Sequence, residues 1–110
     1  MTIETQIARD GGQLVVTLSG RMTFRDYASA EQMLTAIFAQ VDTAVTPKLQ
    51  TLVFSLGAVT MIDSHWLGMF VRAQRQAEAA GLPVILKGAQ PSVRRLFDLV
   101  QFNRVFRIED

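Results

Sequence analysis

The chain has 110 residues, of which 49% are hydrophobic and 19% are charged, and its formal net charge is +1. This composition is typical of a globular protein, and the length fits one domain with a single core, so we expect one domain over residues 1–110. The nearly balanced charge disfavours nucleic acid as a partner, because nucleic-acid binding depends on a concentrated basic surface.

The sequence contains no cysteine. Disulfides and thiolate catalysis are therefore excluded, which agrees with a reducing compartment. No apolar run approaches the about 18 residues that a membrane-spanning helix needs, and the N-terminus has no apolar signal segment. We therefore expect a cytoplasmic protein without direct membrane insertion.

The N-terminal residues predict a β-hairpin. Residues 2–8 alternate loosely between apolar and polar side chains, as edge strands do. Residues 10–12 (Asp-Gly-Gly) have the composition of a hairpin turn, and residues 14–18 form a more apolar strand that we expect to end at residues 19–20.

Residues 24–41 predict an amphipathic helix, because apolar side chains recur there at spacings of three and four. Thr23 is the expected N-cap, and Asp26 would lie favourably at the positive end of the helix. A loop over residues 42–47 is expected to follow.

The middle of the chain is its most apolar stretch. Residues 49–56 predict a strand that is buried on both faces. Gly57 is expected to turn the chain, and the apolar residues 59–62 then lead to Asp63 and Ser64. Both of these residue types cap helix N-termini, because their side-chain oxygens accept hydrogen bonds from backbone N–H groups that have no partner in the helix.

A second helix is therefore predicted from about Ser64 to Ala80, with Gly81 ending it. Its inward positions are expected to be Leu67, Phe70, Val71, Ala77 and either Ala73 or Gln74. Residues 82–86 predict a short strand with a proline near its start, where the missing N–H is tolerated.

A third helix is predicted to begin at Pro91 and to end at Leu99 or Val100. Its inward residues are expected to be Val93, Leu96, Phe97 and Val100. The tail over residues 104–109 predicts a last short strand.

These elements follow the order β-β-α-β-α-β-α-β. Strands that are separated by helices predict right-handed crossovers and parallel pairing. The expected fold is therefore α/β: a small mixed, mainly parallel β-sheet with flanking helices, opened by an antiparallel hairpin.

The residues offer little for catalysis or metal binding. One histidine and no cysteine cannot supply the usual nitrogen and sulfur ligand sets of a metal site within one chain. Ser64 and His65 are neighbours in the predicted helix, so their side chains point in different directions and do not form a catalytic triad. The glycines lack the spacing of a phosphate-binding loop. We expect neither an enzyme nor a bound cofactor.

Ser64 has two interpretations. It could cap the helix, where Asp63 or Ser64 would contribute about 1 kcal/mol to stability. Alternatively, it is a phosphorylation site, since a phosphate would lie at the positive end of the helix and would carry roughly −1.5 to −2 charges. Such a charge would turn a neutral surface negative and could expel a partner.

Three segments resemble the STAS domain family, the sulfate transporter and anti-sigma factor antagonist domains. They are Ser-Leu-Gly-Ala-Val-Thr-Met-Ile-Asp-Ser-His-Trp-Leu-Gly-Met-Phe (residues 55–70), Leu-Ser-Gly-Arg (residues 18–21) and Pro-Ser-Val-Arg-Arg-Leu-Phe (residues 91–97). The resemblance implies a small sheet flanked by helices, no catalytic activity of its own, and partner switching. It also implies two partners, an anti-sigma factor-like serine kinase and a serine phosphatase. By position, Ser64 would be the phosphoacceptor and Asp63 its acidic neighbour.

The sequence departs from the family pattern at two places. The family commonly has a second Ser or Thr and then Gly after the phosphoserine, where this chain has His65 and Trp66. An Asp is common at the position of Thr23, close to the phosphorylation site, and this chain has no acid there.

The first turns of the predicted helix supply the candidate partner contacts. Trp66 is either an exposed binding residue, which could hinder a kinase, or a side chain that packs over the sheet edge. His65 is expected to face solvent, with pH sensing as the alternative. Met69 and Arg72 are expected on the outward face, as partner contacts or as ordinary surface. The whole expected partner-binding set is Thr23, Asp63, Ser64, His65, Trp66, Met69 and Arg72.

The leading hypothesis is a non-catalytic regulator of the anti-sigma factor antagonist type, switched by phosphorylation of Ser64. The alternative is a constitutive STAS scaffold subunit of a larger complex, such as a lipid-transport ATPase assembly, without phosphorylation; the His65-Trp66 pair favours it slightly. A small-ligand binder is the third hypothesis. The sequence leaves the oligomeric state open.

Overall fold

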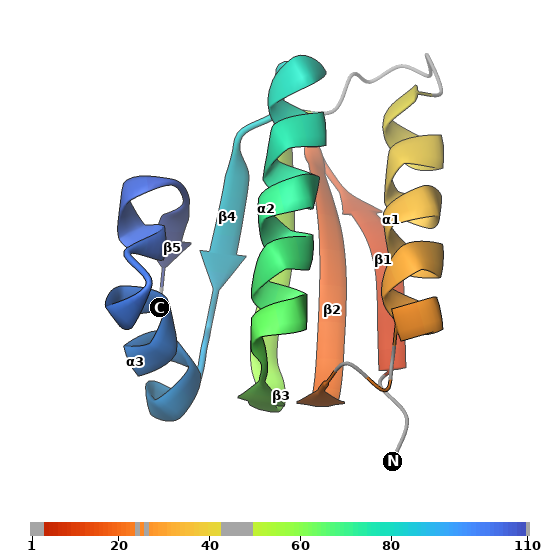
Figure 1. The fold of residues 1–110 in the computed structure, drawn as a ribbon. Helices are drawn as coiled ribbons and strands as arrows, with labels where there is room; N and C mark the ends of the chain where they lie inside the picture. The colour runs from red at the N-terminus through yellow and green to blue at the C-terminus, as the bar shows by residue number, and fades with distance from the viewer. Residues whose placement is uncertain (1–3, 24, 26, 43–49, 110) are drawn as a thin grey trace.

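The computed structural model describes residues 4–23, 25, 27–42 and 50–109, and in these residues it has five strands that form one sheet (Figure 1). The elements in chain order are β1 (Glu4–Asp10), β2 (Gln13–Met22), α1 (Tyr27–Asp42), β3 (Thr51–Ile62), α2 (Ser64–Ala79), β4 (Val84–Lys87), α3 (Pro91–Leu99), the 3-10 helix η2 (Phe102–Arg104) and β5 (Arg107–Glu109). The predicted α/β fold and its element order are confirmed.

The sheet has the strand order β1-β2-β3-β4-β5. The first pair is the predicted antiparallel hairpin, in which Asp10 pairs with Gln13 and Gly11 adopts a φ of +63° in the two-residue turn. The other three pairs are parallel. The carboxyl ends of β2 to β5 therefore meet at one edge of the sheet, where α2 and α3 begin.

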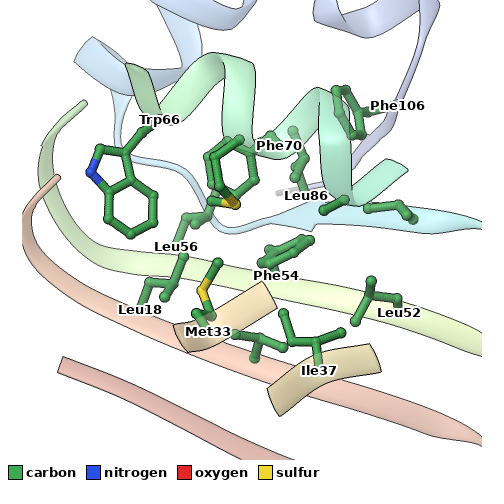
Figure 2. Close-up of a cluster of buried hydrophobic side chains, with 14 of the residues drawn as sticks. Leu18, Met33, Ile37, Leu52, Phe54, Leu56, Trp66, Phe70, Leu86 and Phe106 are labelled. Atoms are coloured by element: carbon green, nitrogen blue, oxygen red, sulfur yellow. The ribbon is translucent and has the colours of Figure 1, made fainter. Parts of the chain in front are cut away.

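The core lies between the sheet and the helices. In Figure 1 α1 and α2 lie across one face of the sheet, and α3 lies beside β4 and β5. Alternate residues of β2 point into this core and are buried: Leu14, Val16, Leu18 and Met22. Aromatic rings connect the layers, because Phe70 of α2 stacks edge-on against Phe54 of β3 and Phe97 of α3, with ring centroids 5.1 and 6.3 Å apart (Figure 2).

Strand β3 does not end where the sequence suggested. It continues through Gly57 to Ile62, so the predicted turn at Gly57 is wrong. The pairing with β2 shows why, since Thr17 and Ser19 face Ser55 and Ala58, which gives two steps on β2 against three on β3. A bulge thus absorbs the glycine.

The bulge changes which side chains of β3 point inward. The residues of β3 that belong to the core cluster are two apart from Leu52 to Leu56 and then three apart, at Val59 and Ile62. A second shift lies beside Gly20, whose φ of +93° lets β2 continue to Met22 instead of ending at residues 19–20. Both strands therefore run on together to the point where Asp63 begins the turn into α2.

The boundaries of α2 and α3 agree closely with the sequence. Helix α2 begins at Ser64 and ends at Ala79, and Gly81 follows it with a φ of +76°, as expected for a glycine after a helix. Helix α3 begins at Pro91, as predicted.

Helix α1 begins later than predicted, at Tyr27, so the expectation that Thr23 is its N-cap is wrong. It also extends to Asp42, which was expected in the loop over residues 42–47. Phe24, Asp26 and residues 43–49 lie outside the described residues, so the expected capping role of Asp26 and the rest of the expected loop do too.

The C-terminal segment differs from the prediction. Helix α3 ends at Leu99, Gln101 adopts a φ of +60°, and η2 then brings Phe102 into the core. Val100, expected to point inward, is consequently 43% exposed. The last strand starts only at Arg107, and Val105 before it is exposed.

Candidate functional site

The candidate site is the junction between β3 and α2. Asp63 has an extended backbone, and its Oδ1 accepts a hydrogen bond from the backbone N–H of Trp66 at 3.2 Å. Of the two possible caps, Asp63 is therefore the one that caps α2. The backbone N–H of Asp63 also donates to the carbonyl of Met22 at 3.0 Å, which ties the junction to the end of β2.

Ser64 is the first residue of α2, and its side chain is exposed. Because Asp63 provides the cap, the serine hydroxyl is not needed to begin the helix. Position 64 therefore combines an accessible hydroxyl with the positive end of a helix of 16 residues.

Trp66 packs inward. Its side chain is fully buried, and its indole N–H donates to the carbonyl of Thr23 at 2.8 Å. Figure 2 shows the ring lying over the sheet beside Leu18 and Leu56. Of the two alternatives for Trp66, packing is the correct one, so the bulky ring leaves the surface around Ser64 open.

The hydrogen bond from Trp66 also places Thr23 next to the first turn of α2. Thr23 follows β2 directly and is half-buried. The site thus joins two segments about 40 residues apart in the chain. Thr23, Asp63 and Ser64 are brought together, as the family resemblance suggested.

Met69 does not lie on the outward face, and that expectation is wrong. Its side chain is only 2% exposed, because α2 lies beside α1 as well as over the sheet (Figure 1). The buried face of α2 is consequently rotated from the predicted one, and Leu67 and Val71 are only partly buried. The buried residues of α2 are Trp66, Met69, Phe70, Ala73 and Ala77.

Arg72 is exposed but is engaged in a bidentate ion pair. Its Nη1 and Nη2 atoms lie 2.6 and 3.2 Å from the two carboxylate oxygens of Glu31 on α1. The hydrogen bond from Arg72 lowers the pKa of Glu31, the charges of Arg72 and His65 lower it further, and desolvation opposes them. Arg72 therefore connects α2 to α1, with the half-buried His65 close enough to act on the same carboxylate.

One feature near the site was not predicted from the sequence. A hollow of about 160 Å³ lies beside the junction, between the end of β3 and the start of α3. Its lining residues are Thr60, Met61, Ile62, Ser92, Val93 and Leu96. Met61 is 40% exposed because the bulges change the inward spacing of β3, and no periodic pattern in the sequence marks them.

The structure adds two observations on the excluded functions. Within the described ranges, no group of three or more His, Cys, Asp or Glu residues could hold a metal ion. No helix in the same residues combines the length and the apolar character that crossing a membrane requires.

Comparisons with known proteins agree on one family. Residues 4–110 match the family model of the STAS domain. A STAS-domain containing protein of Pseudomonas aeruginosa (strain UCBPP-PA14) is 28% identical over 108 residues, which cover 98% of this chain and 99% of that protein.

Solved structures show the same fold. An anti-sigma factor antagonist from Mycobacterium paratuberculosis superposes with a TM-score of 0.78 at 23% identity, over 98% of this chain and 86% of that one. The anti-sigma factor antagonist SpoIIAA in its unphosphorylated form gives a TM-score of 0.76 at 20% identity, over 96% and 87%. The Bacillus SpoIIAA in its phosphorylated form gives 0.69 at 18% identity, over 96% and 90%. With its family model matched over nearly its whole length, the chain belongs to the STAS domain family.

Proposed function

We propose that this protein is a non-catalytic regulatory module of the anti-sigma factor antagonist type, which binds a protein partner and is switched by phosphorylation of Ser64. The observation that carries the proposal is the exposed Ser64 side chain on the first turn of α2, beside a separate cap residue. The likeness to SpoIIAA, solved in an unphosphorylated and a phosphorylated form, supports it.

The junction can accept a phosphate with little change in the backbone. Asp63 directs a carboxylate oxygen at the N–H of Trp66, and the indole ring is buried, so neither side chain has to move to expose the hydroxyl. The positive end of α2 favours the added negative charge. The phosphate would therefore change the surface and leave the core unchanged.

The switch then follows from local charge. The unphosphorylated surface binds its partner, and a phosphate of roughly −1.5 to −2 charges removes that partner by repulsion and by the cost of desolvating the phosphate. A serine kinase of the anti-sigma factor type adds the phosphate, and a serine phosphatase restores binding. This cycle requires no catalytic residue in the STAS chain itself.

The test uses purified anti-sigma-factor-like kinases from the same genome, each incubated with the protein and ATP. We expect one kinase to add a single phosphate, seen by intact-mass spectrometry, and Ser64→Ala to abolish the addition. Thr35→Ala is the control, because Thr35 is an exposed hydroxyl residue on another helix, α1.

Two results would contradict the proposal. The first is no mass shift with any of these kinases, and the second is a phosphate that remains in Ser64→Ala. If wild type and Ser64→Asp retained the same partner equally, the protein would be a constitutive scaffold instead.

A further inference from the structure

The hollow between β3 and α3 is a surface feature that the proposed switch does not use. Its apolar lining residues are Met61, Ile62, Val93 and Leu96. Met61 and Leu96 are the accessible apolar groups, since Met61 is 40% exposed and Leu96 is half-buried, whereas Val93 is 2% exposed. The hydroxyl residues Thr60 and Ser92 complete the rim.

The hollow has the size of one apolar side chain. Its volume is about 160 Å³, and an apolar protein cavity of about 150 Å³ holds a benzene ring. Its lining residue Ile62 ends β3, the strand that leads through Asp63 to Ser64, so the hollow lies at the same end of β3 as the candidate phosphorylation site.

One arginine contacts the lining of the hollow: the guanidinium of Arg21 donates from Nη2 to the Met61 sulfur at 3.4 Å. Arg95 is exposed and precedes Leu96 in α3, and the acidic Asp98 of the same helix is paired with Arg94 at 3.5 Å. None of the described lining residues is acidic. Asp63, which follows the lining residue Ile62, directs a carboxylate oxygen at the helix N-terminus.

We propose that the unphosphorylated protein binds an acidic protein surface that inserts one apolar side chain between Met61 and Leu96. Two observations fix this chemistry. The apolar hollow requires an apolar anchor, and the arginines beside it complement acidic groups around that anchor.

This inference rests on the proposed function in one respect: it uses the expectation that phosphorylation of Ser64 releases the partner. A phosphate on Ser64 would repel an acidic partner and attract a basic one. An acidic partner, which Arg21 and Arg95 favour, would therefore add charge repulsion to the cost of desolvating the phosphate.

The binding test uses the kinase that modifies Ser64, in a Ser64→Ala background so that phosphorylation cannot interfere. Met61→Gln and Leu96→Gln are each expected to weaken the Kd by about tenfold or more, as measured by calorimetry. Val105→Gln is the matched control, because Val105 is 51% exposed on another part of the molecule, and it should stay within about twofold. Circular dichroism confirms that each variant is folded.

The charge test measures association rates against salt concentration. Arg21→Gln and Arg95→Gln should slow association and flatten its dependence on salt, whereas the exposed control Arg104→Gln should not. Arginine variants that associate faster would identify a basic partner and overturn the proposal.

A photo-crosslinking amino acid at position 61 separates this inference from the proposed function. In cells of the source organism it should crosslink to a peptide that carries an apolar residue flanked by acidic residues. This outcome requires no kinase activity. A basic peptide, a lipid or a nucleic acid at position 61, or a crosslink at position 105 alone, would overturn the inference even if Ser64 is phosphorylated.

Discussion

The bidentate ion pair between Arg72 and Glu31 joins the two helices that cover the sheet. Both nitrogens of the guanidinium fork are used, which gives the pair a defined geometry. The pair lies at the surface, where solvent screens it, so we expect it to contribute little to the stability of the fold.

The pair predicts how Glu31 titrates. The pKa of Glu31 is lowered in the folded protein, first by the hydrogen bond from Arg72. The stabilisation is therefore fully present above the unfolded pKa of about 4.3 and is lost as the pH falls through the folded value. We expect an NMR titration to show Glu31 below its ordinary range, and Arg72→Gln to bring it back.

The control for this titration is Arg75→Gln, which removes an exposed cation from the same helix. It should leave the titration of Glu31 unchanged. An equal effect of the two arginine variants would mean that net charge, and not the ion pair, sets the pKa of Glu31.

Individual residues differed in how far the sequence could predict them. A cap at Asp63 or Ser64 was predictable, because the residue types and the start of a periodic pattern are both local, whereas the structure was needed to choose Asp63. The burial of Met69 was not, because it depends on α1 lying beside α2, and helix packing is decided by contacts that the sequence does not display. The sequence left Trp66 open between an exposed binding residue and a packed side chain, because its hydrogen-bond partner, the carbonyl of Thr23, lies in a distant segment of the chain.

Two glycines with contrasting conformations lie in α2 and just after it, at positions 68 and 81. Gly68 lies in the helix interior and Gly81 follows the end of the helix with a φ of +76°. A Cβ atom built on either residue would have nothing within 4 Å. Steric space is therefore the same at both sites, and only the backbone conformation differs.

These glycines give a matched pair of substitutions. Gly68→Ala should raise the free energy of unfolding by about 0.5–1 kcal/mol, because alanine loses less backbone entropy in a helix. Gly81→Ala should lower it by about 1 kcal/mol, because alanine is strained at positive φ. Urea denaturation of both variants checks the signs, and a change of the same sign would contradict this assignment of the two conformations.

The elements themselves were largely predictable, and the two errors in β2 and β3 have one cause. Amphipathic spacing, proline and glycine positions indicated both α2 and α3. The predicted strand ends at Gly57 and Gly20 were wrong, because each glycine lies at a bulge within a strand that continues. The sequence does not distinguish a glycine that ends a strand in a turn from a glycine at a β-bulge, because only the pairing with the neighbouring strand differs between them.

At the scale of the whole molecule, the parallel sheet explains why the site forms where it does. The carboxyl ends of β2 and β3 lie together, and α2 and α3 begin at the same edge (Figure 1). The end of β2 thus lies beside the first turn of α2, and the end of β3 lies beside the start of α3. The strand-helix order predicts this edge, but the hollow depends on the bulges and could not be predicted.

The arrangement also predicts that position 64 tolerates charge. Ser64→Asp should change the free energy of unfolding by less than about 0.5 kcal/mol, because the side chain is exposed and an acid is favourable at a helix N-terminus. Met69→Asp is the control in the same helix, and it should lose about 3 kcal/mol or more because its side chain is buried. Chemical denaturation followed by circular dichroism measures both, and a large loss for Ser64→Asp would mean that the hydroxyl is not at the surface.

Trp66 is the only tryptophan of the chain, and its ring lies enclosed beneath the turn that carries Ser64. The molecule therefore contains its own fluorophore at the place where regulation is proposed, and no label has to be attached. A red shift in emission on modification would report that the ring has become wetter and that Thr23 has been released. An unchanged spectrum would show that phosphorylation alters the electrostatic potential of the surface and leaves the packing around Trp66 unchanged.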